Sequence, residues 1–147
     1  MNVPAITLIS QSEYTTYRWL KNEDFTAFGH HYGGNILKWA EEEAGLFAVR
    51  QLGTFTIATV GISNVTFPQP LAKQEEVLRL DIHSVRFGAS SIRFAVQVSA
   101  ASRGDVILDI GQITVVQLSP EGRPFPHTHS TVIAGSERLV HAPKPFA

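Results

Sequence analysis

The stretch FGHHYGGNILKWAEEEAG, residues 28–45, runs from a glycine-rich segment straight into a helical pattern. From residue 35 to about residue 50, apolar side chains recur at intervals of three and four, and no proline interrupts the run. Gly53 follows as a stop signal. The sequence therefore predicts one long amphipathic helix that begins just after a Gly-Gly pair.

The start of this helix has the chemistry needed to polarise a carbonyl oxygen. Gly33 and Gly34 let the backbone approach a ligand without a Cβ in the way, and the first helical turn leaves N–H donors unpaired. Glu41 follows about two turns later and can act on a group held there. On their own, three consecutive glutamates are more often a solvated helix face, and a Gly-Gly pair can serve close packing alone.

Strand patterns dominate the rest of the chain. Residues 13–21 mix aromatic and β-branched side chains and predict a short first strand. Four longer runs follow the helix and are separated by turn-forming residues: 54–67, 75–87, 90–102 and 105–118. Their short connections favour antiparallel pairing, because the helix comes too early in the chain to connect them.

The third of these runs alternates most clearly between apolar and polar side chains. This period of two predicts one face in the core and one in solvent, namely Ile92, Phe94, Val96 and Val98 against Ser91, Arg93, Gln97 and Ser99.

Composition limits the class of protein. The chain has 147 residues, of which 44% are apolar and 17% charged, and we expect one domain over residues 1–126 with an extended or partly disordered tail over 127–147. A formal charge of -1 offers no strong field for nucleic acid. The lack of cysteine excludes disulfides and Cys-ligated zinc and fits a cytoplasmic location. No segment resembles a secretion signal or a membrane span, so we expect no membrane partner.

Four motifs occur in order between residues 13 and 126: YGGNILKWAE at 32–41, VTFPQP at 65–70, FGASS at 87–91 and EGRPFP at 121–126. They resemble the GG-x-[IL]-[LM]-x-x-[MI]-[DE], F-x-x-P, G-x-[ST]-S and D-x-x-G-[RK]-P motifs of hotdog-fold acyl-CoA thioesterases. The likeness is greatest to small bacterial acyl-CoA hydrolases and to the brain-type long-chain hydrolase. The resemblance implies an α+β hotdog fold, in which an antiparallel sheet wraps around one central helix.

The resemblance also implies roles for residues at the helix start. The amides around Tyr32, Gly33 and Gly34 would stabilise the oxyanion formed from the thioester carbonyl. Glu41 matches the family's acidic residue, usually Asp, which activates water or attacks the thioester directly.

Upstream of the helix the match to the family is incomplete. The family often has Asp-x-Asn-x-x-Gly here, and this chain keeps Asp24 and Gly29 but has Thr26 in place of the amide, with shorter reach and fewer donors. His30 and His31 are candidate general bases or substrate contacts. Two adjacent histidines without further clustered ligands make a weak metal site, so we predict no metal.

The turn after the second long strand resembles the segment that lies near the pantetheine and nucleotide of CoA, often across a subunit boundary. Gly88, Ser90 and Ser91 form that turn, and Arg86 and Arg93 flank it. Their guanidinium groups can meet phosphates with charge-assisted hydrogen bonds. Serine beside glycine is also a common turn former, and strand arginines often serve solubility alone.

Together these features lead us to expect an enzyme that hydrolyses an acyl-CoA, or an acyl-carrier thioester, to the free acid without a cofactor. Hotdog monomers expose a sheet edge, so we expect a homodimer or a higher oligomer such as a tetramer or hexamer. Two alternatives stay open. One is a dehydratase or hydratase of enoyl thioesters that uses His30 or His31 with a carboxylate. The other is a non-catalytic binding module for acyl-CoA or an acyl carrier, which Thr26 favours.

Overall fold

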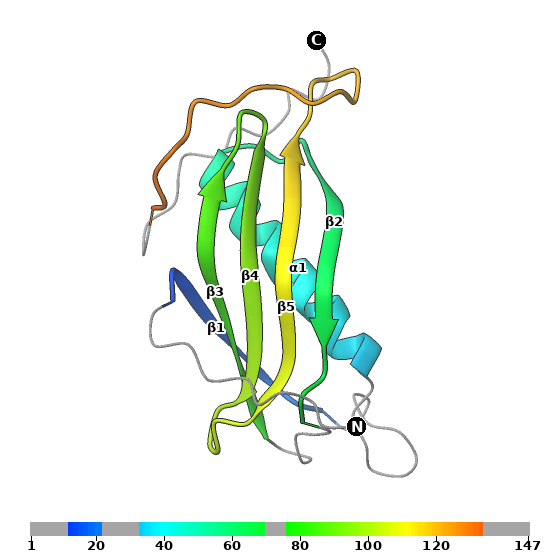
Figure 1. Cartoon of the computed structure of the whole chain (residues 1–147), viewed down its shortest axis with the longest axis vertical. Helices are drawn as coiled ribbons and strands as arrows, with labels where there is room; N and C mark the ends of the chain where they lie inside the picture. Colours follow the sequence, from blue (N-terminus) through cyan, green and yellow to red (C-terminus); the bar gives the residue numbers. More distant parts are fainter. Residues whose placement is uncertain (1–11, 22–32, 70–75, 134–147) are drawn as a thin grey trace.

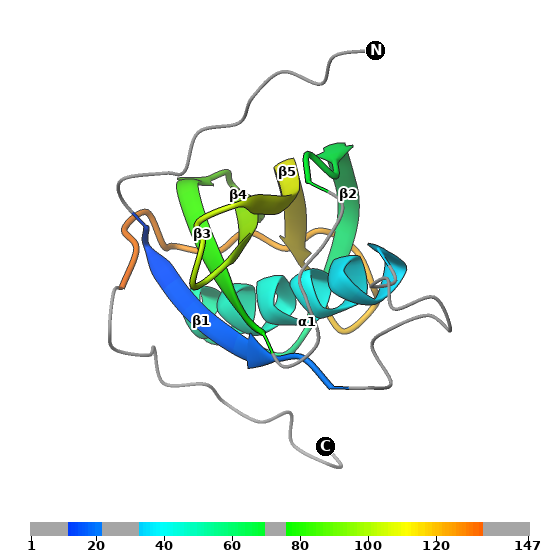
Figure 2. The same cartoon turned by 90° about the horizontal axis from the view of Figure 1, so that it is seen from below.

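A computed structural model describes residues 12–21, 33–69 and 76–133. In these residues, an antiparallel sheet of five strands curves around one helix, α1 (Gly33–Leu52) (Figures 1 and 2). The strands lie in the order β1-β3-β4-β5-β2. Their bounds are β1 (Tyr14–Trp19), β2 (Ile57–Thr66), β3 (Val77–Phe87), β4 (Ser91–Ala100) and β5 (Val106–Gln117). This arrangement confirms the predicted fold class of a sheet wrapped around one central helix.

The helix is longer than the sequence predicted. It begins at Gly33, two residues before the predicted start, so the Gly-Gly pair forms its first turn instead of preceding it. It ends at Leu52 because Gly53 adopts a positive φ of 73° and donates its N–H to Val49 O at 2.8 Å. This left-handed residue closes the helix as predicted.

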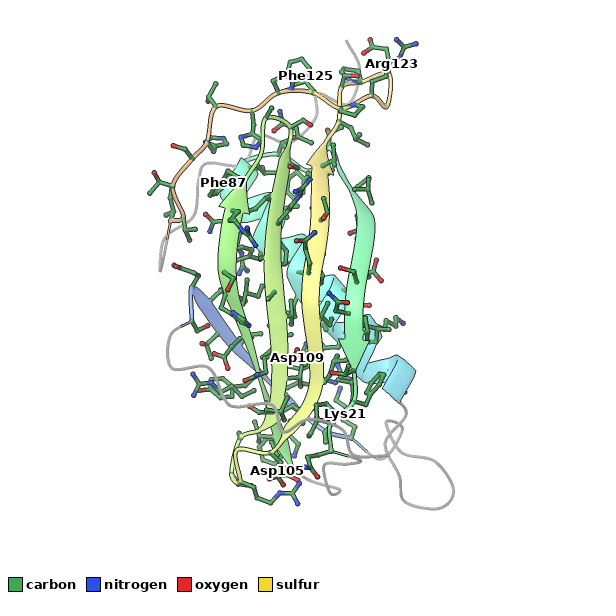
Figure 3. The ribbon with its side chains drawn as sticks, in the orientation of Figure 1. Lys21, Phe87, Asp105, Asp109, Arg123 and Phe125 are labelled. Atoms are coloured by element: carbon green, nitrogen blue, oxygen red, sulfur yellow. The ribbon has the colours of Figure 1, made fainter. Side chains whose placement is uncertain are left out.

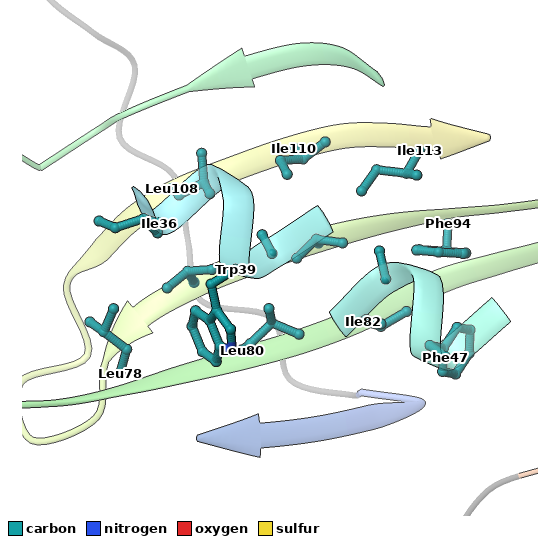
Figure 4. Packing of buried hydrophobic residues seen from close by; sticks show 14 of the residues in the cluster. Ile36, Trp39, Phe47, Leu78, Leu80, Ile82, Phe94, Leu108, Ile110 and Ile113 are labelled. Atoms are coloured by element: carbon teal, nitrogen blue, oxygen red, sulfur yellow. The ribbon is translucent and has the colours of Figure 1, made fainter. Parts of the chain in front are cut away.

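The core lies between α1 and the inner face of the sheet. The helix buries one stripe of side chains at spacings of three and four, which includes Ile36, Trp39, Ala40, Ala44, Phe47 and Ala48. Phe47 meets Phe94 of β4 edge-on, with ring centroids 5.2 Å apart (Figure 4). The apolar set predicted for β4 is buried against this stripe, so that half of the alternation is confirmed.

The prediction that the other face of β4 is in solvent is wrong for two residues. Gln97 and Ser99 are each only 2% exposed, although both point away from α1. Alternation along one strand reveals which face packs on the helix. It carries no information about what covers the opposite face.

A row of polar side chains crosses that outer face. The strand register places Thr15 opposite Asp81, Asp81 opposite Gln97, and Gln97 opposite Asp109. Buried Asp81 accepts hydrogen bonds from Thr15 Oγ1 at 2.6 Å and from Arg79 Nε at 2.9 Å, and Gln97 Nε2 donates to Asp109 at 3.4 Å. The row therefore satisfies its own buried polar groups.

Strand β2 forms one edge of the sheet. Among the described residues it pairs with β5 alone, and Val60 at a bulge and Ile62 are 61% and 37% exposed. An edge of this kind leaves a row of backbone donors and acceptors without ladder partners. The described helix is not long and apolar enough to cross a bilayer.

After β5, residues 118–133 form an extended segment, which we call the C-terminal strap. It crosses the end of the sheet at the β3–β4 turn and reaches the C-terminal end of α1 (Figure 1). The predicted tail falls partly within the strap, while residues 134–147 lie outside the described residues. The domain boundary at residue 126 stays a prediction.

Replacement of Asp81 by alanine is expected to lower the free energy of unfolding by about 1–3 kcal/mol, because it leaves Thr15 and Arg79 without their acceptor. The hydrogen bond and then the charge of Asp81 raise the pKa of Arg79, so the ion pair persists throughout the neutral range. Urea unfolding measures the loss. Asp105→Ala is the control, since its pair with Arg103 is exposed, with 3.6 Å between Arg103 Nε and Asp105 Oδ2. Equal unfolding midpoints for the two variants would contradict a structural role for the row.

Candidate functional site

The predicted site residues that the structure describes lie around two separate hollows. One is a groove beside α1, and the other lies at the turn between β3 and β4. Asp24, Thr26, His30, His31 and Tyr32 fall outside the described residues, and their predicted roles stay predictions.

The start of α1 is open and lacks negative charge. No acidic residue occupies its first turn, so no carboxylate there neutralises the positive end of the helix dipole. A Cβ on Gly33 would lie 3.1 Å from the Phe67 ring, which makes Gly33 a site of close packing. A Cβ on Gly34 would meet nothing within 4 Å among the described neighbours. Gly33 therefore serves packing, while Gly34 leaves room for a ligand.

A groove of about 630 Å³ runs along α1 beside β2, and we call it the helix groove. It is lined by Lys38, Glu41, Glu42, Gly45, Leu46, Val49 and Ile57. Leu46, Val49 and Ile57 form an apolar wall, and the carboxylates of Glu41 and Glu42 lie at one end of it. Leu46 is 48% exposed, so this wall presents a large apolar side chain to solvent.

The three consecutive glutamates of α1 divide between two sides of the helix. Glu41 and Glu42 are exposed and line the helix groove. Glu43 instead accepts a hydrogen bond of 3.5 Å from the Tyr14 hydroxyl, and Arg50 donates to the same hydroxyl at 3.0 Å. Glu43 therefore belongs to the contact between α1 and β1, and the groove holds only the first two carboxylates.

The second hollow has a volume of about 370 Å³, and we call it the turn hollow. It is lined by Arg86, Phe87, Gly88, Ala89, Ser90, Ser91, Arg93 and Gln112. All five residues that the sequence analysis assigned to this turn line it together. A Cβ on Gly88 would collide with Ser91 Oγ, so a larger residue there would displace the Ser91 hydroxyl from its present position in the turn hollow.

Two like charges face each other at the turn hollow. Arg86 of β3 lies directly opposite Arg93 of β4 in the antiparallel register. Within the described part of the chain, neither guanidinium has an ion pair with a carboxylate. Like charges directly opposite on a sheet destabilise it, and an anion between them would relieve the repulsion. The turn hollow is therefore suited to a phosphate group.

Two polar lining residues had no role in the sequence-based predictions. Gln112 reaches the turn hollow from β5, and Lys38 lies in the helix groove one turn before Glu41. Gln112 belongs to no recognisable motif, and Lys38 occupies a variable position of the motif at 32–41. The pairing of β4 with β5 is what brings Gln112 beside the turn, so only the strand register could have revealed it.

The start of α1 and the turn hollow lie toward opposite ends of the protein. In Figure 1 the first residues of α1 lie at the lower end of the sheet, while the β3–β4 turn lies at the upper end. Figure 3 places Phe87 at the same end as Phe125 and Arg123 of the strap, and Asp105 at the other. The helix start and the phosphate-suited turn are thus not neighbours in one copy of the chain.

Comparisons with known proteins agree with this architecture. A model of the thioesterase superfamily matches residues 28–107. An acyl-CoA hydrolase from Staphylococcus aureus, solved with butyryl-CoA and CoA, is 23% identical over 79% of this chain and 69% of its own, with a TM-score of 0.67.

Two further solved structures have a similar fold. A hexameric thioesterase from Yersinia pestis is 20% identical over 83% of this chain and 99% of its own, with a TM-score of 0.68. A 1,4-dihydroxy-2-naphthoyl-CoA thioesterase from Synechocystis is 20% identical over 77% and 88%, with a TM-score of 0.62. None of the curated proteins matches this chain.

Proposed function

Because this chain belongs to the thioesterase superfamily, we propose that it hydrolyses the thioester of an acyl-CoA to a free acid and CoA. The observation that carries the proposal is the helix start: an open, acid-free first turn with Glu41 two turns further on, in a groove with an apolar wall. Such a groove suits an acyl chain, and such a helix start suits a carbonyl that gains negative charge.

The chemistry follows from these groups. The backbone amides at the start of α1 bind the thioester oxygen and stabilise the oxyanion as it forms. Glu41 either takes a proton from the attacking water or forms an acyl intermediate that water then hydrolyses. In both routes a carbon–oxygen bond forms, the carbon–sulfur bond breaks, and the CoA thiolate leaves and takes up a proton. No cofactor is needed.

The nucleotide end of CoA is assigned to the turn hollow. Arg86 and Arg93 supply the positive charge, and Ser90, Ser91 and the backbone of Gly88 supply neutral hydrogen-bonding groups. The Staphylococcus aureus hydrolase of similar fold was solved with CoA bound, which supports a CoA ligand.

The distance between the start of α1 and the turn hollow in one copy favours a site shared between two copies of the chain. In the part of the chain that the structure describes, strand β2 pairs on one side only, and apolar Leu46 and Val60 are exposed. Pairing of two β2 edges across a two-fold axis reverses the direction of the partner sheet. The partner's turn then comes to the end where α1 begins.

We therefore propose at least a homodimer. The Yersinia pestis protein of similar fold is hexameric, which supports further assembly of such dimers. The absence of cysteine from the sequence is compatible with the cytoplasmic location that we propose.

Glu41→Gln is expected to lower kcat on acyl-CoA substrates by about 100-fold or more, because the amide can neither accept a proton from water nor attack the thioester. A thiol reagent that reports free CoA measures the rate across a panel of acyl chain lengths. Glu42→Gln is the matched control in the same groove and is expected to change kcat by less than about twofold. A Glu41→Gln rate equal to that of the wild type would remove Glu41 from its role. Turnover of an enoyl-CoA without CoA release would instead indicate a hydratase.

Arg86→Ala and Arg93→Ala are each expected to raise KM for acyl-CoA by about tenfold, with less effect on kcat, since each removes a contact to phosphate. The difference from wild type should shrink as salt is added, because salt screens exposed charges. Arg103→Ala is the control, as Arg103 lies at the far end of the sheet and pairs with Glu76 at 3.3 Å. An unchanged KM in both arginine variants would exclude the turn hollow as the phosphate site.

Leu46→Glu is expected to convert the protein to monomers and to abolish hydrolysis, because it places a charge in the proposed contact between copies. Sedimentation velocity gives the mass of the particle, and the thiol assay gives the rate. Tyr17→Glu adds the same charge at an equally exposed position on β1 and should keep the dimer. Monomers of the wild type with full activity would overturn the shared site.

A further inference from the structure

Two backbone donors in the middle of the C-terminal strap bind the end of the sheet. Pro124 and Pro126 have no N–H, and the residue that follows each proline donates to the sheet end. Phe125 N–H donates to Gln117 O at 2.8 Å, and His127 N–H donates to Ala89 O at 3.0 Å. Within residues 124–127, every backbone N–H therefore fastens the strap to β5 or to the β3–β4 turn.

His127 fastens the turn twice. In addition to the backbone bond to Ala89, its ring nitrogen Nε2 lies 2.9 Å from Ser91 O. The Gln117 N–H donates to the remaining carbonyl, Ser90 O, at 2.8 Å. Three consecutive carbonyls of the turn are therefore held from outside the hairpin, two of them by one residue.

The contacts of the His127 ring select its tautomer. Ser91 O can only accept, so Nε2 carries the proton. The other nitrogen, Nδ1, lies 3.1 Å from the backbone N–H of His129, which can only donate, so Nδ1 is the acceptor. The ring therefore links Ser91 of the turn to His129 of the strap.

Two rings pack against this imidazole. The Phe87 ring of β3 meets it edge-on with centroids 5.8 Å apart, and the His129 ring stacks on it at 5.8 Å and 15°. These contacts hold the imidazole in the orientation that both of its hydrogen bonds require.

The far end of the strap is anchored independently of His127. His129 Nε2 lies 3.0 Å from Leu52 O, the last carbonyl of α1. Gln51, which is buried, binds the backbone of Ile133 in both directions, with distances of 2.9 Å and 3.1 Å. Removal of the His127 side chain should therefore loosen the turn without releasing the strap.

We propose that His127 is a positioning residue for CoA: it holds the β3–β4 turn in the shape that binds the phosphate-bearing end of the substrate. This inference rests on the proposed acyl-CoA hydrolysis. Loss of the imidazole removes the hydrogen bond to Ser91 O and loosens the turn, so affinity for CoA falls while the chemistry at Glu41 is not directly touched.

The test compares His127→Ala and His127→Gln with the wild type. In His127→Ala we expect a KM about fivefold or more above that of the wild type and a kcat within about twofold. The His127→Gln variant keeps an N–H donor for Ser91 O, so its KM should stay near the wild-type value.

His129→Ala is the matched control in the strap. It removes the anchor on α1 but keeps the backbone N–H that His127 accepts, so we expect a lower Tm and an unchanged KM. If His127→Ala does not fold, His127→Leu, which keeps a bulky side chain but has no donor for Ser91 O, carries the same expected rise in KM. Isothermal titration with free CoA gives a second measure of affinity that needs no turnover.

The outcomes separate the two proposals. A wild type that neither hydrolyses acyl-CoA nor binds CoA overturns the proposed function. A wild type that does both, with a folded His127→Ala variant matching its KM, overturns the role of His127 alone. Loss of kcat with unchanged KM in His127→Ala would also contradict a positioning role at the turn.

Discussion

The contact on which the structure depends is the packing of one stripe of α1 against the inner face of the sheet. Trp39, Phe47 and the alanines between them fill the space above β3, β4 and β5, and this apolar burial is the main stabilising term of such a fold. Because the stripe covers only one side of the helix, the opposite side stays free. Everything that we assign to chemistry lies on that free side or at the ends of the elements that the core holds.

The same packing explains why the groove and the edge lie together. The helix crosses the sheet beside β2, so its exposed flank and the unpaired strand form one continuous surface with an apolar wall. In a single chain this surface is open to water, and the apolar side chains of Leu46 and Val60 are exposed there. A second copy both buries these side chains and brings its own turn toward the helix start. Assembly and catalysis are therefore linked in our proposal through one surface.

The outer face and the strap show a second way of holding the sheet. Polar side chains there are buried with their partners, as in the row from Thr15 to Asp109, and they fix strand register more than they add stability. The strap works similarly at the end of the sheet, where prolines restrict its donors and histidine rings supply the remaining contacts. In this chain, the β3–β4 turn lies beyond the apolar core and is positioned by hydrogen bonds.

The sequence by itself determined the helix, the five strands and their order along the chain. The periods of 3.6 and 2 and the stop at Gly53 are local properties of the chain. It also placed Gly33, Gly34, Glu41, Arg86 and Arg93 in motifs, although their roles stay predictions. Only the tertiary structure decided what faces each motif. The burial of Gln97 and Ser99 and the position of Gln112 beside the turn arise from the assembly of the sheet, and the two bonds of His127 arise from contact between the strap and the turn. All of these contacts join residues that are distant in sequence. No local pattern encodes such contacts, because each contact depends on where a second, distant segment of the chain lies in the fold.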